Sequence, residues 1–444
     1  MKIRGLLFAI IILGGLLGAL YWSNRHKPAD KDEAAASSSP KILQLKEDGI
    51  SKIDLKKKGG NDILLAKDSA GKWQMTAPET YGVDQDTINN MVSALSALDA
   101  ERTVEDKASD LGQYGLSDPA LQVTVTEKDN KTHDLLLGDD TAASGAVYAK
   151  LGGDAHVYTV SKYSKESIDK GVNDLRDKRL LTVDSEKISK VELAGKKPDI
   201  EFGRNKDEWQ IVKPKPMRAD TSSVDELVNA LTDAKMDLGG SEDDLKKAAS
   251  AFASGTPVAT AKVTDLSGTQ ELQVRKSKDN TYYAKSSIIT GAYKVENTLG
   301  QALAKNLDDF RNKKLFDFES DDPTKVEIHD GAKAYYLTKG GDDWFSGDGK
   351  KLDGTSADAV VDGLRELSAT KFPDSGFTTP VMQITVTSNE NKRVEKVAIA
   401  KAATDYIAKR DGDASLYELD AKSIDDLQKA EAGLKPAAPP PGKK

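Results

Sequence analysis

The sequence predicts an α+β protein of three tandem repeats, each a mostly antiparallel sheet with one or two packed helices, preceded by a single transmembrane helix. The main observation is a pattern that occurs three times, as Ile50–Leu55, Ile188–Leu193 and, more loosely, Thr324–Ile328. A tryptophan follows each copy: Trp73, Trp209 and Trp344. The steps between these tryptophans are 136 and 135 residues, which is typical of a repeated domain and far longer than a solenoid unit.

Each repeat begins with an alternating strand such as Ile50–Leu55, in which charged residues separate the apolar ones. Turn residues then lead to a hairpin partner, and a third short strand contains the tryptophan. Apolar residues spaced by three and four follow, as in Ile88–Leu98, and predict a helix with one apolar face. Further strands come after Pro119, Pro257 and Pro380, and a closing helix ends the first two repeats. This order of elements favours antiparallel sheets.

These patterns divide the chain into six parts. They are a transmembrane anchor at 1–23, a flexible linker at 24–41, repeat domains at 42–184, 185–321 and 322–434, and a disordered Pro-rich tail at 435–444. The linker and the tail are assigned from composition, because their Ala-, Ser- and Pro-rich stretches lack the apolar pattern of a packed element.

The N-terminal run Gly5–Trp22 is apolar and follows Lys2 and Arg4. As a helix it would span about 27 Å, close to the roughly 30 Å thickness of the hydrocarbon core. The run lacks a small-x-small cleavage site, which favours an uncleaved anchor over a cleaved signal peptide. Positive charge flanks both ends, so the N-terminal position of the anchor is what favours export of the remaining chain. We expect a single-pass protein of the cytoplasmic (inner) membrane whose bulk is extracytoplasmic or periplasmic.

The composition excludes several classes of function. The net charge of −8 argues against nucleic acid as a partner, because nucleic-acid-binding proteins present basic patches to the phosphates. The absence of cysteine excludes disulfides, thiolate metal sites and a cysteine nucleophile. Each repeat must therefore be held together by packing alone.

A basic sequence lies between consecutive repeats. Asp174–Leu181 corresponds to Asp309–Phe316, and the match decays after the third copy. Because the basic residues recur where another repeat follows, we expect them to join neighbouring repeats by pairing with acidic residues. These inter-repeat candidates are Arg176, Arg179, Arg311 and Lys314. The alternative is a solvated helix end with cations near its negative pole.

Residues present in all three repeats are better explained as scaffold than as parts of a unique active site. Three aspartates each precede an apolar helix and fit N-caps: Asp84, Asp220 and Asp353. The three tryptophans have apolar neighbours and fit the core, with a glycan-stacking platform as the alternative. The Tyr-Ala-Lys strands are candidates for an exposed recognition face: Tyr148, Lys150, Tyr283, Lys285, Tyr406 and Lys409. A sheet edge protected by lysine is the alternative for these strands.

The sequence contains no recognisable catalytic, cofactor-binding or metal-binding motif. The four histidines form no HExxH and no close pair, and they are better explained as surface residues: His26, His133, His156 and His329. Phosphate-binding loops, EF-hand loops and nucleophile elbows are also absent from the sequence. We expect no catalytic residue, no cofactor and no metal. Loops are expected where the copies differ, at Gly138–Thr141 and Ser241–Lys247.

The N-terminal segment Met1–Gly5, the Ile-Ser-Lys strands, the Trp-Gln strand and Tyr114–Leu116 ahead of Pro119 resemble the bacterial "domain of unknown function 4340" family. The resemblance covers most of the chain after the linker and carries over no catalytic residue. It implies a membrane-anchored envelope protein, often encoded beside transporters of the ATP-binding-cassette (ABC) type, including gliding-motility-like systems.

The expected function is that of a non-enzymatic accessory or scaffold protein, tethered to the cytoplasmic membrane through Gly5–Trp22, with an ABC-type transporter component as its protein partner. One alternative is an envelope module that binds glycan or peptide through exposed aromatic residues. The other alternative is an enzyme of unrecognised type.

Overall fold

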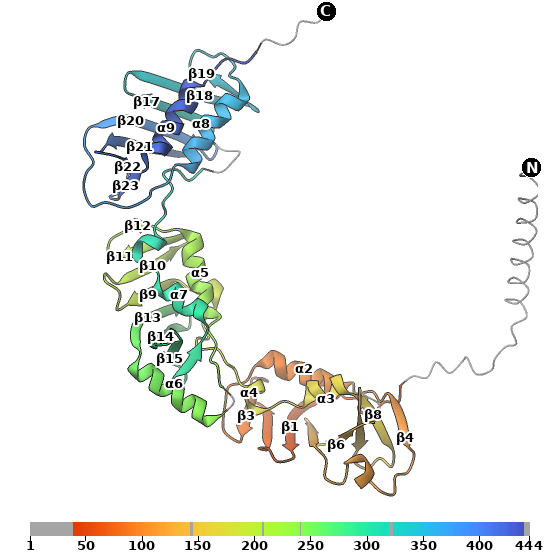
Figure 1. Ribbon diagram of the computed structural model, residues 1–444. Helices are drawn as coiled ribbons and strands as arrows, with labels where there is room; N and C mark the ends of the chain where they lie inside the picture. The colour runs from red at the N-terminus through yellow and green to blue at the C-terminus, as the bar shows by residue number, and fades with distance from the viewer. Residues whose placement is uncertain (1–38, 143–144, 207, 240, 319–322, 439–444) are drawn as a thin grey trace, which may run out of the picture. The chain divides into compact units, whose positions relative to one another are not determined.

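The structure is a computed structural model that describes residues 39–142, 145–206, 208–239, 241–318 and 323–438. The chain divides into two compact units, with the boundary between Asp177 and Lys178. The described residues form three antiparallel sheets and eight α-helices (Figure 1). The predicted α+β class with antiparallel sheets is therefore confirmed.

The first unit contains an eight-stranded sheet. Its strands, in spatial order, are β3 (Trp73–Ala77), β2 (Ile63–Lys67), β1 (Ile50–Lys57), β5 (Leu121–Glu127), β6 (Thr132–Asp140), β7 (Ala146–Leu151), β8 (Val157–Ser161) and β4 (Arg102–Glu105). Its helices are α2 (Gln85–Ser96), α3 (Lys162–Ile168) and α4 (Val172–Leu175). Ile53 of β1 lies opposite Leu65 on one side and Val125 on the other, so apolar residues form rows across one face of the sheet.

The second sheet belongs to the second unit. Its strands, in spatial order, are β12 (Met217–Arg218), β11 (Glu208–Lys213), β10 (Ile200–Asn205), β9 (Lys190–Ala194), β13 (Thr256–Asp265), β14 (Gly268–Lys276), β15 (Tyr282–Ser286) and β16 (Tyr293–Val295). The helices α5 (Thr221–Thr232) and α7 (Asn297–Ala304) pack against each other on its apolar face. A further helix, α6 (Glu242–Ser254), contacts β15 and β16.

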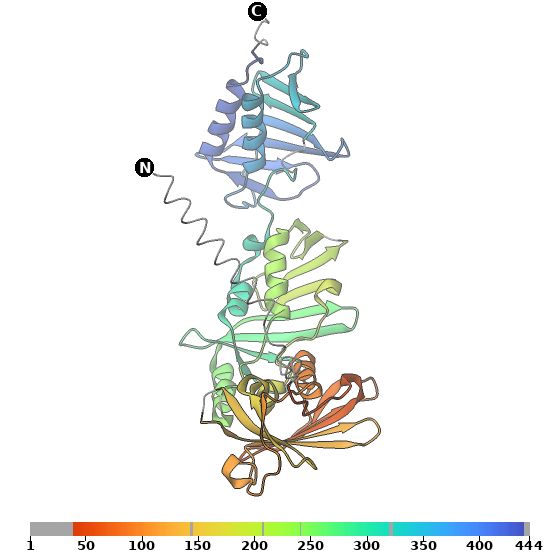
Figure 2. The same cartoon turned by 90° about the vertical axis from the view of Figure 1, so that its right-hand side faces the viewer.

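The third sheet also belongs to the second unit. Its strands, in spatial order, are β19 (Asp343–Ser346), β18 (Lys333–Gly340), β17 (Lys325–Asp330), β20 (Pro380–Ser388), β21 (Arg393–Lys401), β22 (Tyr406–Arg410) and β23 (Leu416–Leu419). The helices α8 (Gly354–Glu366) and α9 (Ala421–Ala432) lie side by side on one face of this sheet and leave the opposite face uncovered by helix (Figure 2).

Seven strands follow the same order in each sheet. In each sheet, the third, second and first strands along the chain are followed by a run of four later strands. This run comes after the N-capped helix α2, α5 or α8. The orders are β3-β2-β1-β5-β6-β7-β8, β11-β10-β9-β13-β14-β15-β16 and β19-β18-β17-β20-β21-β22-β23. The additional strands β4 and β12 extend the first and second sheets at opposite ends. Within each run of three or four strands, consecutive strands are antiparallel neighbours because short turns join them.

The three recurrent aspartates cap α2, α5 and α8. The side chain of Asp84 accepts the backbone N–H of Thr87 at 3.0 Å. Asp220 and Asp353 accept the N–H groups of Ser223 and Ser356 at 2.8 and 3.0 Å. Such a bond satisfies one of the free N–H groups in the first helical turn and stabilises a helix by about 1 kcal/mol. The predicted capping role is confirmed.

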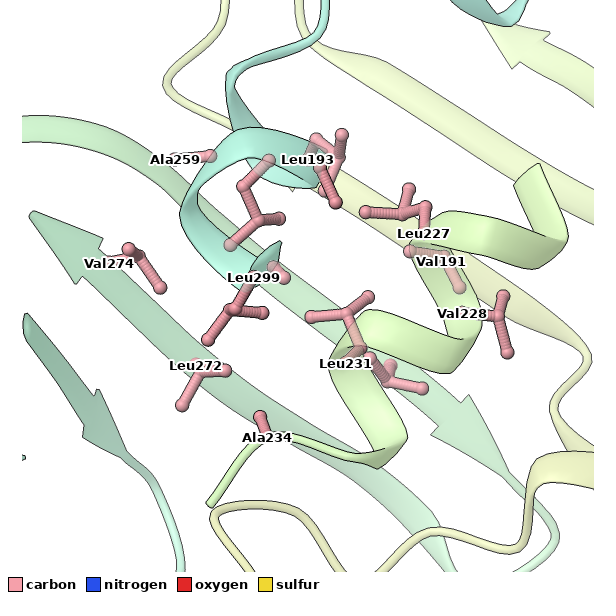
Figure 3. Packing of buried hydrophobic residues seen from close by; sticks show 14 of the residues in the cluster. Val191, Leu193, Leu227, Val228, Leu231, Ala234, Ala259, Leu272, Val274 and Leu299 are labelled. Atoms are coloured by element: carbon pink, nitrogen blue, oxygen red, sulfur yellow. The ribbon is translucent and has the colours of Figure 1, made fainter. Parts of the chain in front are cut away.

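Each sheet has a core of its own. Trp73, Trp209 and Trp344 are 3, 3 and 4% exposed, which confirms the predicted core role and contradicts a stacking platform at these positions. In the second core, Leu231 of α5 and Leu299 of α7 lie over Leu272 of β14 (Figure 3). Burial of each such leucine side chain stabilises the fold by roughly 1.5–3 kcal/mol.

The predicted transmembrane anchor at 1–23 lies outside the described residues. Across the part of the chain that the structure describes, no helix has the length and apolar character needed to span a membrane. The end of the predicted linker is paired, because the Ala100 N–H donates to the Pro40 carbonyl at 2.7 Å. The start of the predicted tail is paired as well, since the Asp353 N–H donates to Lys435 O at 2.9 Å and the Ala437 N–H donates to Lys351 O at 2.9 Å.

Two segments that were expected to be loops have regular structure. Residues of Ser241–Lys247 begin α6, because Ser241 accepts the Asp244 N–H as an N-cap and Phe252 further along provides a buried apolar residue. Most of Gly138–Thr141 belongs to β6, whose residue Asp140 pairs with Val147 of β7 beyond a register shift. Local polarity predicted loops, and contacts with neighbouring strands override that preference.

Two helical glycines give a matched test of packing. A Cβ on Gly300 of α7 would lie 2.2 Å from the Tyr282 ring, whereas a Cβ on Gly363 of α8 would lie 3.4 Å from Leu427. Alanine is favoured over glycine inside a helix, so we expect Gly363→Ala to raise the free energy of unfolding by up to about 1 kcal/mol. We expect Gly300→Ala to lower the free energy of unfolding by about 1–3 kcal/mol, because the added methyl group would clash with the Tyr282 ring. Denaturation followed by circular dichroism measures both, and equal effects would contradict the packing argument.

Candidate functional site

The first half of the peptide between the second and third sheets pairs with the residues ahead of α5. The Asp220 N–H donates to Phe310 O at 2.8 Å, and the Asn312 N–H donates to Arg218 O at 3.0 Å. Phe310 is fully buried in the second core, where its ring lies 5.0 Å from that of Phe202. The peptide is therefore fastened to the second sheet by backbone hydrogen bonds and by an aromatic anchor.

The second half of the same peptide pairs with the residues after α8. The Leu315 N–H donates to Leu367 O at 3.0 Å, and the Ala369 N–H donates to Lys313 O at 2.8 Å. Leu315 and Phe316 are buried in the third core, which therefore begins before the predicted boundary at 321/322. Short backbone pairing on both sides leaves this connection with few free polar groups.

Arg311 lies in the middle of this peptide and is 8% exposed. Its guanidinium lies 3.5 Å from the ring centroid of Phe372, and its Nη1 lies 3.3 Å from the Asp308 carboxylate. The acidic partner therefore comes from the same peptide, while the contact with the third sheet's segment is a cation–π interaction. The backbone of Lys314 forms a bridge with Ser368.

The corresponding arginines of the first junction lie in different units. Arg176 lies in the first unit, where its guanidinium stacks 4.0 Å from the ring centroid of Tyr81 and its backbone bridges to Val83. Arg179 lies in the second unit, where its backbone bridges to Lys235. In both junctions the arginine of the Leu/Phe-Arg step, Arg176 or Arg311, stacks on an aromatic ring.

Arg218 was missed by the sequence reasoning, although it contacts both the connecting peptide and the third sheet. Its Nη1 donates to Lys314 O at 2.7 Å and to the Tyr417 hydroxyl at 3.4 Å, and its Nη2 forms a salt bridge with Asp317. The first repeat has Gly82 at the equivalent position. The sequence signal that could have identified Arg218 is therefore the difference between the repeats at this position.

Charged residues of β21 and β22 complete this cluster around Asp317. Glu395, which is 7% exposed, accepts the Asp317 N–H at 3.2 Å and the Arg410 Nη2 at 2.9 Å. Arg410 also lies 3.5 Å from Asp317, and Arg393 donates to its carbonyl oxygen. Buried charges are tolerated when each one is paired and hydrogen-bonded, and here positive and negative groups alternate. We call Arg218, Asp317, Arg393, Glu395 and Arg410 the junction cluster.

A groove of about 1180 Å³ lies beside the junction cluster. Residues of β11, β12, β21 and β22 and of the adjacent turns line it, among them Trp209, Met217, Asn389 and Asp411. The arginines of the cluster are already engaged by carboxylates and carbonyl oxygens. The groove therefore offers shape and hydrogen-bonding groups, while the arginines that line it are engaged within the junction cluster.

A buried tyrosine hydrogen-bonds to an aspartate in the first and third sheets. Tyr158 donates to Asp154 at 2.6 Å, and Tyr417 donates to Asp413 at 2.5 Å. Burial and this hydrogen bond raise the pKa of each tyrosine to about 12. Burial would raise the pKa of Asp154, but the hydrogen bonds from Tyr158 and His156 outweigh it and lower the pKa to about 2. Both groups keep their ordinary charge near neutral pH, which suits a structural clamp.

The predicted recognition face is covered in the first sheet. The Tyr148 ring lies 4.9 Å from the ring of Tyr114, a residue of the segment between β4 and β5. The ammonium of Lys150 donates to the backbone oxygen of Leu151 at 3.2 Å and to that of Asp154. Tyr148 is therefore covered by the segment that contains Tyr114, and Lys150 is engaged by the backbone at the end of β7 and in the turn after it.

Helix α6 covers the equivalent face in the second sheet. Phe252 of α6 lies between Lys285, at 5.0 Å from its ring centroid, and Arg275, at 4.9 Å. Tyr283 is half-buried on the same strand as Lys285. The segment ahead of β5 in the first sheet and the segment ahead of β13 in the second thus differ in structure but cover the same place.

In the third sheet, the prediction that Tyr406 lies on an exposed face is wrong. Tyr406 is 9% exposed and belongs to the third core, so it cannot form part of an exposed face. Side chains alternate along a strand, and the additional residue between Tyr406 and the Ala-Lys pair puts this tyrosine on the core side. Lys409 is exposed, and its ammonium has no hydrogen bond or ion pair within the described ranges.

The described histidines are each paired with a carboxylate. His133, His156 and His329 lie 2.9, 2.6 and 2.6 Å from the carboxylates of Glu127, Asp154 and Glu327. Among the residues that the structure describes, no group of three or more potential metal ligands is found. The remaining histidine, His26, lies outside those residues.

The chain belongs to the family described as Domain of unknown function (DUF4340). Two stretches match this family, residues 73–210 and 209–392, and together they span well over half of the chain. The resemblance inferred from the sequence is therefore confirmed. The two matches begin at Trp73 and Trp209, at the step of the sequence repeat. No curated protein and no solved structure matches the chain.

Loss of Arg218 tests the junction cluster. We expect Arg218→Ala to lower the free energy of unfolding by about 1–3 kcal/mol, because it removes the salt bridge to Asp317 and the hydrogen bond to Lys314 O and leaves Asp317 with the longer contact to Arg410. Hydrogen exchange of the Asp309–Asp317 backbone, followed by mass spectrometry, should become faster. As a control, Lys246→Ala removes an exposed ion pair on α6 and should change stability by less than about 1 kcal/mol. Unchanged exchange in the Arg218 variant would show that the cluster does not hold the peptide.

Glu431 is a second buried acid, on α9 in the third core's helical layer. It is 1% exposed, and neither carboxylate oxygen has a hydrogen-bond partner within the described part of the chain. Burial, together with the smaller effect of the nearby Asp330 carboxylate, raises the pKa of Glu431 to about 7, although the Lys333 ammonium opposes the shift. The protonated acid is therefore favoured in the folded protein at mildly acidic pH.

The raised pKa predicts a loss of stability with rising pH. The stabilisation is complete below the ordinary glutamate pKa of about 4.5 and is lost as the pH rises through about 7. The expected decrease in the free energy of unfolding is up to about 3 kcal/mol. Glu431→Gln should abolish this decrease, whereas the exposed control Glu366→Gln should retain it. Denaturant titrations between pH 4 and pH 8 measure the difference, and identical profiles for wild type and Glu431→Gln would refute it.

Proposed function

We propose that this chain is a non-enzymatic, membrane-anchored extracytoplasmic accessory or scaffold protein that serves an ABC-type transport or gliding-motility-like system. Membership of the family supports a chain of this kind, and Gly5–Trp22 is the proposed anchor. The transporter component and the location outside the cytoplasm are parts of the proposal.

The observation that carries the proposal is that the residues present in all the repeats have structural roles. The aspartates cap helices, the tryptophans fill cores and Arg176 and Arg311 stack beside the junction peptides. The same strand order, built three times from these residues, provides extended sheet faces on a long chain. Such an architecture suits binding of other proteins, because interfaces need broad, preformed surfaces.

The lack of cysteine makes the location testable with single-cysteine variants of the full chain. Tyr163 and Leu266 are 80 and 84% exposed, and Val160 is fully buried. We expect a membrane-impermeant maleimide to label Tyr163→Cys and Leu266→Cys in intact cells. Val160→Cys is the matched control and should react after denaturation alone. Labelling of the exposed variants that requires lysis of the cytoplasmic membrane would place the sheets inside the cell and overturn the proposed location.

The partner is tested with the same exposed variants. A cysteine-linked photo-crosslinker at Tyr163→Cys in α3, Leu266→Cys in the turn between β13 and β14, or Val394→Cys in β21 samples one exposed position in the part of the chain that builds each sheet. We expect mass spectrometry of the crosslinked products to identify a membrane component of an ABC-type transporter, and expect no such product without illumination. Recovery of no membrane protein from any of the three positions would contradict the accessory role.

A further inference from the structure

The face opposite the helices carries equivalent rows of residues in the three sheets. Each row crosses β5, β13 or β20 and the next two strands of its sheet: Gln122–Leu136–Lys150, Thr260–Gln273–Lys285 and Gln383–Ala398–Lys409. The lysines are those of the three Tyr-Ala-Lys strands. The rows therefore allow the three sheets to be compared position by position.

The covering of the row differs in the third sheet. Lys150 donates to backbone oxygens and Lys285 stacks on Phe252 of α6. Lys409 is exposed, and its ammonium has no partner within the described ranges. The residue beside it is Ala398, where the other rows have leucine and glutamine. A short side chain at the centre of the row leaves space that the other sheets fill.

The charge at an adjacent position is reversed. Asp134 of the first sheet and Glu271 of the second correspond to Lys396 of the third, since each lies two residues before the central residue of its row. Asp134 accepts a hydrogen bond from Thr124 at 2.6 Å. The ammonium of Lys396 forms no ion pair or hydrogen bond with another described residue. The third sheet thus has two unpaired lysines where the others have one lysine and one acid.

These differences coincide with a hollow of about 460 Å³, which is within the usual size range of small-molecule sites. Lys396, Ala398 and Lys409 line it, together with Phe377 from the segment ahead of β20 and the polar side chains of Gln383 and Thr385. The hollow therefore combines two cations, hydrogen-bonding groups and an aromatic ring.

One acid near the hollow opposes anion binding. Asp411 also lines the hollow, and its N–H donates to the Lys396 carbonyl at 2.8 Å. The other acid, Asp413, already accepts hydrogen bonds from Tyr417 and from the Ser415 N–H. Lys396 and Lys409 therefore outnumber Asp411, the one lining carboxylate without a side-chain partner among the described residues, and removal of Asp411 should strengthen binding of an anion.

We propose that this hollow binds a small organic anion, with its carboxylate or phosphate group between Lys396 and Lys409 and its apolar or aromatic part against Phe377. The charged group gains charge-assisted hydrogen bonds from the two ammonium groups. The apolar or aromatic part of the anion gains contact with the Phe377 ring. This site adjoins the junction cluster, because Arg410 belongs to the cluster and also lines the hollow, but the proposal does not depend on the proposed scaffold role.

Phenyl phosphate is a suitable probe, titrated into the full chain by calorimetry, with inorganic phosphate and benzyl alcohol as partial probes. We expect phenyl phosphate to bind more tightly than phosphate, and expect no binding of benzyl alcohol up to about 10 mM. Lys396→Gln and Lys409→Gln should each weaken phenyl phosphate binding at least about five-fold. Asp411→Asn should strengthen it about two-fold or more. Phe377→Ala should weaken phenyl phosphate binding but leave inorganic phosphate binding unchanged.

Lys285→Gln in the second sheet is the matched control, because it removes the equivalent lysine without touching the hollow. Its binding should equal that of the wild type, and thermal unfolding should verify that every variant is folded. The proposal is overturned if phenyl phosphate does not bind below about 10 mM, or if Lys396→Gln and Lys409→Gln bind it as the wild type does. Weakening by Asp411→Asn would equally contradict the assigned charge balance.

Discussion

The structure depends on the need of each antiparallel sheet to bury one apolar face. Alternation along the strands gathers residues such as Ile53 and Val125 on one side, and that side is stable when helices remove it from water. The N-capped helices, the buried tryptophans and the aromatic anchor Phe310 all serve this covering. The recurrent residues are thereby committed to the scaffold, which leaves function to the opposite faces and to the segments that differ.

The connection between the second and third sheets follows from the same constraint. Its peptide places Phe310 in one core and Phe316 in the other, so both ends are fixed by apolar burial. The backbone between them must satisfy its polar groups, and it does so by pairing with residues ahead of α5 and after α8. The junction cluster adds alternating charges around Asp317, which compensates the desolvation of Glu395 and Arg410.

The covering of the faces opposite the helices is where the sheets diverge. The first sheet uses a segment that contains Tyr114, the second uses the helix α6 with Phe252, and the third leaves Lys409 uncovered beside Ala398. The same position in the common strand order is therefore covered by different segments in the first and second sheets and is left as a hollow in the third. Family membership alone says nothing of this difference, because it reflects the scaffold that the copies share.

The sequence by itself determined the α+β class, the antiparallel hairpins, the aspartate caps and the core role of Trp73, Trp209 and Trp344, because these follow from local periodicity and capping chemistry. It also singled out the stretches in which the copies differ. Tertiary structure alone decided that Ser241 begins a helix and that Tyr406 turns inward. It alone brought Arg218 to Asp317, and Lys396 and Lys409 to one hollow. The physical reason is that strand register and long-range charge pairing join residues far apart in the chain, which local patterns do not specify.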